Sequence, residues 1–194
     1  EWLRSLGIGQ QALREATGGI FVVSEANLKY HRPARLDDEL VVTARLQEAG
    51  AIMVTKTTMP DYGMLSSGLS SFHHLSRNPW DLRKTPGGSS AGGGAAAAAG
   101  YGPLHIGTDI GGSLRLPAGW CGIFSLKPSN GRIPIDPPYT GRAAGPMTRT
   151  VEDAALMMRV LSQPDARDSM SLPYQPIAWE QADAGVHRLR GLRI

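Results

Sequence analysis

The stretch TPGGSSAGGGAAAAAGYGPLHIGTDIGGSLR, from Thr85 to Arg115, decides the fold of this chain. It contains two clusters of glycine followed by serine, GGSS at residues 87–90 and GGS at residues 111–113. Glycine permits backbone conformations that other residues avoid and lets a ligand approach the main chain closely. We therefore expect both clusters to form tight turns, and we interpret the whole stretch as a candidate active site.

Small side chains fill the segment between the two clusters, Ala91–Gly100. This composition predicts a helix that can lie very close to a neighbouring element, although three internal glycines weaken it by about 1 kcal/mol each relative to alanine. Ser89 and Ser90 are well placed to cap its N-terminus. On residue types alone, a capped helix between two turns is therefore an alternative to an active site.

The GGSS cluster and the segment GTDIGGSLRLPA at Gly107–Ala118 together resemble the signature motifs of the amidase signature family of serine hydrolases. Ser113 follows Ser89 by 24 positions, a spacing that the family shares. The turn RNPWD at residues 77–81 also resembles the family, and the resemblance covers about residues 49–194. It implies an α/β fold with a mixed twisted sheet flanked by helices, and with the alanine-rich helix buried against the sheet.

The resemblance also implies a role for each residue of the two clusters. Ser113 would be the nucleophile, and Ser89, following a cis peptide bond, would relay a proton between Ser113 and a lysine. A developing oxyanion needs donors that are fixed before the reaction. Main-chain N–H groups of four residues match this oxyanion hole: Ile110, Gly111, Gly112 and Ser113. Three further positions would brace the loop: Ser90, Asp109 and Arg115.

A serine hydroxyl needs a neighbouring base to become a useful nucleophile. The family's catalytic lysine belongs to a segment upstream of the turn at Lys56, and that part of this chain resembles a different family. Of the lysines present, Lys56 matches a structural lysine and Lys127 precedes a proline turn. We predict that Lys84 or Lys29 replaces the missing base, with a solvated or structural lysine as the alternative for each.

Residues 1–48, including EWLRSLGIGQQALREATGGIFVVSEANLKYHRPARLDDELVV, resemble part of a hotdog-fold acyl-CoA thioesterase of the small bacterial type. Alternating residues predict strands at Phe21–Tyr30 and Leu40–Leu46. That family's catalytic aspartate would precede Glu1, so we identify no thioesterase active site. We expect residues 1–48 and 49–194 to form one folded unit, in which the hotdog-like helix and strands complete a truncated amidase-like core.

Two further elements are expected outside the central stretch, one from the resemblance and one from the residue pattern. In AGAIMVTKTTMPDYG, residues 49–63, the family resemblance implies a strand followed by a lysine-threonine turn. Further on, Thr150 predicts a helix N-terminus with Asp153 at the capping-box position. Four apolar residues at helical spacing would form the core face of this helix: Val151, Ala154, Ala155 and Met158.

Composition excludes several classes of function. With 194 residues and 41% hydrophobic content, the chain is long enough for one domain with a real core. Its net charge of +3 comes from scattered arginines, so we expect no nucleic-acid partner. Cys121 is alone, which predicts a buried thiol in a reducing compartment. We find no metal-ligand spacing, phosphate loop, apolar span or leader pattern, and we expect a cytoplasmic protein without metal or cofactor.

The histidines offer no second route to catalysis. We expect the adjacent pair, His73 and His74, to be exposed, and we interpret His105 as a core histidine on a strand.

Three functions remain open at this point. The first is a serine hydrolase that acts through an acyl-enzyme on Ser113, with esters favoured over amides because a weakened base gives little help to a leaving amine. The second is a non-catalytic fusion of two gene fragments, and the third is residual acyl-CoA thioesterase activity. Because two truncated domains leave sheet edges and apolar faces uncovered, we also predict a homo-oligomer, most simply a dimer.

Overall fold

In the computed structural model, the structure describes residue 46 and residues 49–181. The described helices are α4 (Ala91–Ala98), α5 (Arg115–Cys121) and α6 (Val151–Leu161), and the strands are β1 (Leu104–Asp109), β2 (Phe124–Ser125) and β3 (Ala143–Thr148). Two short 3-10 turns lie at Asp61–Gly63 and Trp179–Gln181. The strands predicted within residues 21–46, apart from Leu46 itself, lie outside the described residues, as does Lys29.

The three strands form one sheet in the order β1-β3-β2, and both neighbouring pairs are antiparallel. Thr148 of β3 stands opposite Leu104 of β1 on one side and Phe124 of β2 on the other. We expected a mixed sheet, and for the described strands this is wrong. The chain crosses from β1 to β2 through α5, which makes these two strands run in the same direction, but β3 then enters between them and separates them.

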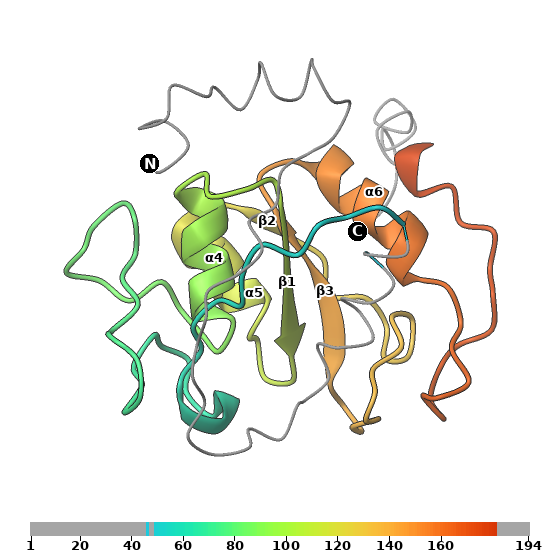
Figure 1. Cartoon of the computed structure of the whole chain (residues 1–194), viewed down its shortest axis with the longest axis horizontal. Helices are drawn as coiled ribbons and strands as arrows, with labels where there is room; N and C mark the ends of the chain where they lie inside the picture. The colour runs from blue at the N-terminus through green and yellow to red at the C-terminus, as the bar shows by residue number, and fades with distance from the viewer. Residues whose placement is uncertain (1–45, 47–48, 182–194) are drawn as a thin grey trace, which may run out of the picture.

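The predicted strand within residues 49–63 is also wrong. Residues 51–60 form neither helix nor strand, and the chain there runs as an extended segment past β1 (Figure 1). The family resemblance implied a strand here, but no described strand pairs with this segment.

Helix α6 follows its sequence pattern closely. The side chain of Thr150 accepts a hydrogen bond of 3.1 Å from the backbone N–H of Asp153, which confirms the predicted N-cap. Ala154, Ala155 and Met158 are buried as predicted, but Val151 is 43% exposed. Val151 lies on the same side of the helix as the buried residues, so the predicted core face is correct. Val151 is exposed because no other described element covers it in the first turn of α6.

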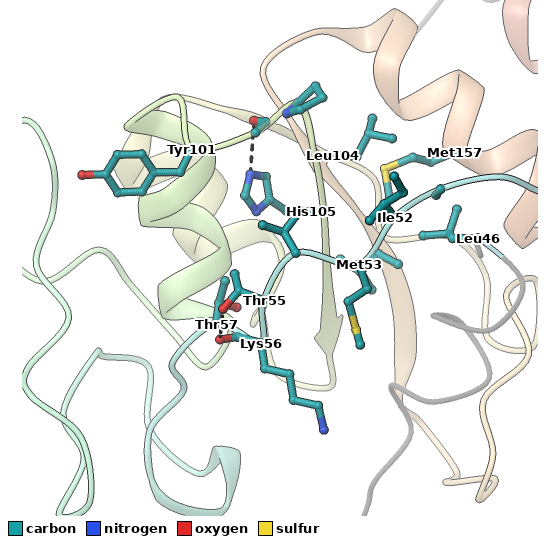
Figure 2. Close-up of a pocket in the computed structure, with 15 residues that line it drawn as sticks. Leu46, Ile52, Met53, Thr55, Lys56, Thr57, Tyr101, Leu104, His105 and Met157 are labelled. Carbon is teal, nitrogen blue, oxygen red and sulfur yellow. Dashed lines mark hydrogen bonds between the residues drawn. The ribbon is translucent and has the colours of Figure 1, made fainter. Parts of the chain in front are cut away.

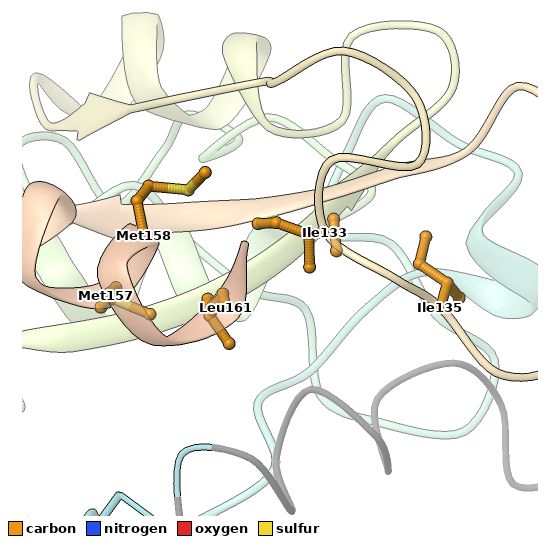
Figure 3. Packing of buried hydrophobic residues seen from close by; sticks show 6 residues of the cluster. Ile133, Ile135, Met157, Met158 and Leu161 are labelled. Carbon is orange, nitrogen blue, oxygen red and sulfur yellow. The ribbon is translucent and has the colours of Figure 1, made fainter. Parts of the chain in front are cut away.

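The buried face of α6 builds the main core together with β3 and the segment before it. Figure 3 shows Met157, Met158 and Leu161 of α6 gathered near Ile133 and Ile135, and Ala144 of β3 completes the cluster. Each of the large side chains is at most 2% exposed. Full burial of such a side chain contributes about 1.5 to 3 kcal/mol, so this cluster is a principal source of stability.

Helices α4 and α5 lie on the other side of the sheet from α6 (Figure 1). The buried residues of α4 are all small: Ala91, Gly93, Gly94 and Ala97. A Cβ atom on Gly94 would lie only 2.7 Å from the Cβ of Pro117 in α5, a distance that real side chains do not tolerate. The predicted close packing of the alanine-rich helix is therefore confirmed, with glycine permitting the closest approach.

Candidate functional site

The first serine cluster forms an enclosed turn in front of α4. Its peptide bond between Gly88 and Ser89 is cis, as the family resemblance implied. Ser89 is 4% exposed, and a Cβ atom added to Gly63 would lie 3.5 Å from its Oγ atom. The loop that begins at Asp61 therefore covers this serine from outside.

Ser90 occupies the N-cap position of α4, but its side chain makes no capping hydrogen bond. Its hydroxyl instead donates to the carbonyl of Thr108 at 3.2 Å and accepts from the N–H of Thr108 at 3.1 Å. The prediction that this serine caps the helix is therefore wrong. The hydroxyl turns toward β1 because it can satisfy both main-chain groups of Thr108 there, and it joins the start of α4 to the strand that leads to the second cluster.

The second serine cluster is shaped by one buried carboxylate. Asp109 is fully buried at the end of β1 and accepts hydrogen bonds from the backbone N–H groups of Gly112 (2.8 Å), Leu114 (3.1 Å) and Arg115 (3.4 Å). These donors lie on both sides of Ser113. The carboxylate therefore fixes the conformation of the chain that carries the predicted nucleophile.

Arg115 completes the environment of this carboxylate. Its guanidinium donates two hydrogen bonds to Asp109, at 3.0 and 2.9 Å, in a bidentate pair. Burial alone would raise the pKa of Asp109, but the hydrogen bonds from Arg115 and from the three N–H groups outweigh it and lower the pKa to about 2. Asp109 is therefore ionised at neutral pH and acts as a fixed negative charge, not as a proton acceptor.

The two serine turns lie side by side. The backbone N–H of Ser90 donates to the carbonyl of Ser113 at 3.4 Å, and the Ser90 hydroxyl anchors the strand just before Asp109. Main-chain contacts thus bring Ser113, the predicted nucleophile, and Ser89, the residue before Ser90, into one region of the fold. All three supporting residues predicted from sequence, Ser90, Asp109 and Arg115, make hydrogen bonds within this arrangement.

The N–H groups proposed for the oxyanion hole differ in availability. Within the described residues, those of Ile110, Gly111 and Ser113 donate to no protein acceptor, whereas that of Gly112 is engaged by Asp109. Ile110 and Gly111 are exposed, and Ser113 is half-buried. The turn therefore presents unpaired donors at a surface that a substrate can reach.

Among the described residues, no lysine side chain makes a hydrogen bond with either serine turn. The side chain of Lys84 is exposed, and the hydrogen bonds of this residue come from its backbone, which pairs with Asn78 and Asp81. Lys127 donates from Nζ to the carbonyl of Pro128 at 3.3 Å. The described part of the chain thus leaves the general base unassigned.

Thr85 contributes to the first turn and was missed by sequence reasoning. Its hydroxyl accepts hydrogen bonds from the N–H groups of Gly87 (3.2 Å) and Gly68 (3.3 Å). A threonine whose hydroxyl bonds the backbone two residues later is a recognised local turn motif. The sequence TPG at residues 85–87 therefore fits this motif, and the role of Thr85 could have been predicted from it.

A pocket of about 130 Å³ lies apart from the serines, between the segment 51–57, the start of β1 and α6. In Figure 2, Ile52, Leu104 and Met157 surround it, while the Lys56 side chain extends away from them. None of the described residues predicted for the site lines this pocket. Its walls are mostly apolar, with His105 as the titratable group on the β1 side.

The histidines are placed as the sequence predicted. His105 is partly buried on β1, where its Nε2 lies 3.3 Å from the carbonyl of Gly102. Burial lowers the pKa of His105, the hydrogen bond to Gly102 opposes this, and the nearby charge of Arg149 adds to the lowering. His73 and His74 are exposed.

Cys121 is also buried, as expected, and burial raises the pKa of its thiol to about 11. Among the residues described by the structure, no group of three or more histidine, cysteine or acidic side chains is arranged to hold a metal ion. Within the same part of the chain, no helix has the length and apolar character needed to cross a membrane.

Known proteins match most of the chain. The family described as Amidase matches residues 26–194. A glutamyl-tRNA(Gln) amidotransferase subunit from Desulforapulum autotrophicum is 47% identical over 144 residues, which cover 72% of this chain and 29% of that protein.

Solved structures agree with this match. The structure of 6-aminohexanoate cyclic dimer hydrolase complexed with substrate matches with a TM-score of 0.68 and 34% identity, covering 72% of this chain and 30% of that chain. The native peptide amidase from Stenotrophomonas maltophilia matches with a TM-score of 0.64 and 31% identity, covering 71% and 30%. The chain thus spans about a third of the length of these relatives.

These matches correct part of the interpretation of the N-terminal segment. The family match begins at residue 26, inside the segment 1–48 for which we expected a thioesterase-like origin, and nothing in the comparisons supports a hotdog part. How the chain divides into domains stays a prediction. The small sheet with its helices is a partial α/β fold of the matched kind. With most of its length covered by one family, the chain belongs to the amidase signature family.

Proposed function

We propose that this protein hydrolyses amide bonds through an acyl-enzyme on Ser113. The observation that carries the proposal is the hydrogen bond from the N–H of Ser90 to the carbonyl of Ser113, which holds the two serine turns side by side. Relatives that share this part of the chain are named as a peptide amidase and a cyclic dimer hydrolase. Because the chain covers about 30% of each of these, the activity of the whole protein is part of the proposal.

In the proposed reaction, the Ser113 hydroxyl oxygen attacks the carbonyl carbon of the amide while its proton passes through Ser89 to a base. The resulting oxyanion is stabilised by the N–H groups of Ile110, Gly111 and Ser113. The N–H of Gly112 is not among these donors, because it is hydrogen-bonded to the carboxylate of Asp109 at 2.8 Å. The C–N bond then breaks, the returned proton leaves with the amine, and water hydrolyses the acyl-enzyme to the acid and free Ser113.

The base in this scheme is Lys29 or Lys84. Lys29 falls within the residues that match the family and lies outside the described structure, and Lys84 is exposed five positions before Ser89. A general base takes up the proton of the nucleophile in the transition state, so removing the amine that acts as the base should lower kcat by about 100-fold or more, whereas removing the other lysine should not. Single replacements by methionine distinguish the two, because methionine keeps the length of the side chain and removes the amine.

Amide hydrolysis replaces the ester preference that we expected from sequence, since the comparisons support amide substrates and give no support to a preference for esters. A matched pair of substrates tests this point: a short-chain p-nitroanilide and the p-nitrophenyl ester with the same acyl group. An ester is intrinsically more reactive, so the informative quantity is the rate enhancement over the uncatalysed reaction for each. A larger enhancement for the ester would restore the first expectation.

The central experiment combines fluorophosphonate labelling with p-nitroanilide turnover. We expect the native protein to be labelled on Ser113 and to turn over the anilide, and we expect both activities to disappear in Ser113→Ala. In Ser89→Ala the proton relay is lost, and we expect at least a 100-fold decrease, about the size of a general acid–base contribution. Ser129→Ala, at an exposed serine on a turn, is the matched control and should behave like the native protein.

Labelling and turnover that persist in Ser113→Ala would assign the nucleophile elsewhere. A folded native protein that shows neither activity would favour the non-catalytic fusion instead.

We also propose that the protein is a homodimer. The support is a set of large apolar side chains that are highly exposed, among them Tyr62 (96%), Met64 (80%) and Phe72 (78%), on the loop that covers Ser89. Association of two copies would cover large apolar side chains that are exposed on one loop. Light scattering on the purified protein measures the mass directly, and the mass of a single 20.7 kDa chain at micromolar concentration would refute the dimer.

A further inference from the structure

A turn ahead of the first serine cluster plays no part in the chemistry described so far. It runs from Asn78 to Asp81, whose backbones pair in an isolated bridge. The indole N–H of Trp80 donates to the carbonyl of Cys121 at 2.7 Å, and the side-chain amide of Asn78 donates to the carbonyl of Trp120 at 2.8 Å. Two side chains of one turn therefore bond two consecutive carbonyls of a segment about forty residues away.

Those carbonyls belong to the last turn of α5. The final carbonyls of a helix lack partners within the helix and have to be satisfied from outside. Gly122 ends the helix in the left-handed conformation with φ of 68°, and its N–H returns to the carbonyl of Ala118. Trp80 and Asn78 satisfy two of the remaining carbonyls, so the turn 78–81 acts as a side-chain cap for the C-terminus of α5.

The opposite end of α5 carries the nucleophile. The N–H of Leu116 donates to the carbonyl of Gly112 at 2.7 Å, and that of Ala118 donates to the carbonyl of Leu114 at 3.1 Å, so the helix continues directly out of the second serine turn. Seven residues at about 1.5 Å per residue place the two ends of α5 about 10 Å apart. The cap and the second serine turn are therefore the two ends of one short helix.

The same turn also leads into the first serine cluster. Pro86 accepts a hydrogen bond from Cys121 Sγ at 3.4 Å, and a Cβ atom on Gly87 would lie 2.9 Å from the backbone nitrogen of Pro117. Residues 78–87 are therefore attached along the length of α5 from its last turn to its middle. Helix α5 therefore contacts the segment that leads into the first serine turn, in addition to the direct bond from the N–H of Ser90 to the carbonyl of Ser113.

We propose that Trp80 is a positioning residue for the reaction, with Asn78 as its partner: by capping α5, they hold Ser113 in register with Ser89. The inference rests on the proposed hydrolysis for its effect on rate. Its effect on the coupling of the two turns is independent of catalysis. Trp80 is 74% exposed, so it buries little surface, but its indole N–H is hydrogen-bonded. Its contribution therefore comes mainly from this hydrogen bond, which a substitution can remove.

The test replaces Trp80 by phenylalanine, which keeps an aromatic ring and removes the N–H donor. Trp120→Phe is the matched control, because Trp120 lies in the same region, is 47% exposed, and makes no side-chain hydrogen bond among the described residues. The first readout is p-nitroanilide turnover. We expect kcat of Trp80→Phe to fall about 3- to 10-fold, the range for one lost neutral hydrogen bond, with KM unchanged. Trp120→Phe should keep both constants.

The second readout is amide hydrogen exchange, which does not require activity. We expect Trp80→Phe to speed exchange at the remote N–H groups of Ser90, Gly112 and Leu114, as well as near its own contact at residues 118–123. Faster exchange confined to residues 78–84 and 118–123 would show a local structural role and overturn the inference. Equal effects of Trp80→Phe and Trp120→Phe on kcat and on remote exchange would overturn it as well.

The two readouts also separate this inference from the proposed function. A native protein without turnover refutes the hydrolase, and the exchange pattern alone then decides whether Trp80 couples the two serine turns. Turnover in the native protein combined with an unchanged kcat in Trp80→Phe refutes the positioning role and leaves the hydrolase intact.

Discussion

The two serine turns are built in opposite ways. The first, residues 87–90, is enclosed by other backbone: Gly87 faces the backbone of Pro117, and a Cβ atom on Gly88 would lie 2.6 Å from the carbonyl oxygen of Leu65. The second, residues 110–113, is open, since Ile110 is 53% exposed and a Cβ atom on Gly111 would meet nothing within 4 Å.

The difference also concerns what holds each turn. Packing from outside fixes the first turn, whereas a single buried carboxylate, that of Asp109, fixes the second from inside. A turn held from inside can leave its outer face free for a substrate. An enclosed turn keeps water away from a proton relay. This difference is consistent with the proposed roles of Ser113 as nucleophile and Ser89 as proton relay. Four measurements test whether the two turns differ in this way.

The largest effect is expected when the internal support of the open turn is removed. Asp109→Asn leaves the guanidinium of Arg115 without its ion pair and loses the charge that holds three N–H groups. We expect unfolding in urea to show a loss of about 3 to 5 kcal/mol, because several hydrogen bonds to one charged acceptor, each worth about 1.5 to 3 kcal/mol, are lost or weakened together. Asp81→Asn, which breaks an exposed pair with Arg83, is the control and should leave the urea midpoint nearly unchanged. A similar midpoint in both variants would show that the open turn does not depend on this carboxylate.

The next effect concerns the enclosed turn. Gly87 has φ of 87°, and a methyl group there would meet Pro117 at 2.9 Å, so Gly87→Ala should lose about 2 to 3 kcal/mol of unfolding free energy. Gly111→Ala places the same methyl group in open space in the other turn and should change stability by less than about 0.5 kcal/mol. Thermal melts of the two variants compare the turns directly. Equal losses would remove the distinction between enclosed and open.

The dependence of stability on pH gives a smaller effect with a definite sign. The folded pKa of Asp109 is about 2, below the ordinary value near 4. As the pH falls, the unfolded chain therefore binds this proton first, and the contribution is complete above about pH 5 and lost as the pH passes through about 2. It amounts to about 2 kcal/mol at neutral pH.

Two half-buried carboxylates act in the same direction, since hydrogen bonds from Ser71 lower the pKa of Asp61 and those from Arg83 lower the pKa of Asp81. The difference between the native protein and Asp109→Asn isolates the buried group. Urea midpoints between pH 2.5 and 7 should fall more steeply for the native protein. Parallel curves would contradict the assignment.

The smallest expected effect concerns the link between the two turns. Ser90→Ala removes both hydrogen bonds to the main chain of Thr108 and should cost about 1 to 2 kcal/mol of stability. Because residue 90 keeps its N–H bond to Ser113, the turns should stay together and labelling of Ser113 should decrease only modestly. Ser129→Ala serves again as the control. Complete loss of labelling in folded Ser90→Ala would mean that this hydroxyl takes part in the chemistry.

Helices α6 and α4 differ in how much of their structure could be predicted from the sequence. The cap and most of the buried face of α6 were predictable, since Thr150 bonds to a backbone group three residues away and the apolar spacing is local. Helix α4 was predictable as an element, but Ser90, one of the two serines considered as an alternative cap, makes no capping hydrogen bond. The competing partner, Thr108, is remote in sequence, and no local pattern indicates that it offers both a donor and an acceptor.

The candidate site divides in the same way. The positions of Ser89, Ser113 and Asp109 were available from motif spacing, and the engagement of Gly112 by Asp109 was not, because it depends on how tightly the turn closes around the carboxylate. The role of Trp80 was hidden for a similar reason. Its motif was visible in the sequence, but its partner is a helix end about forty residues away.

The family of this protein, its two serine turns and its helices could be identified from the amino-acid sequence. The reason is that glycine placement, helical spacing and capping each act over a few neighbouring residues. Three features became visible only in the folded chain: the antiparallel order of the sheet, the unequal enclosure of the two turns and the partner of each buried polar group. These depend on which distant main-chain donors and acceptors meet. Every buried polar group has to find such a partner, and several segments compete for each one, so only the folded chain selects among them.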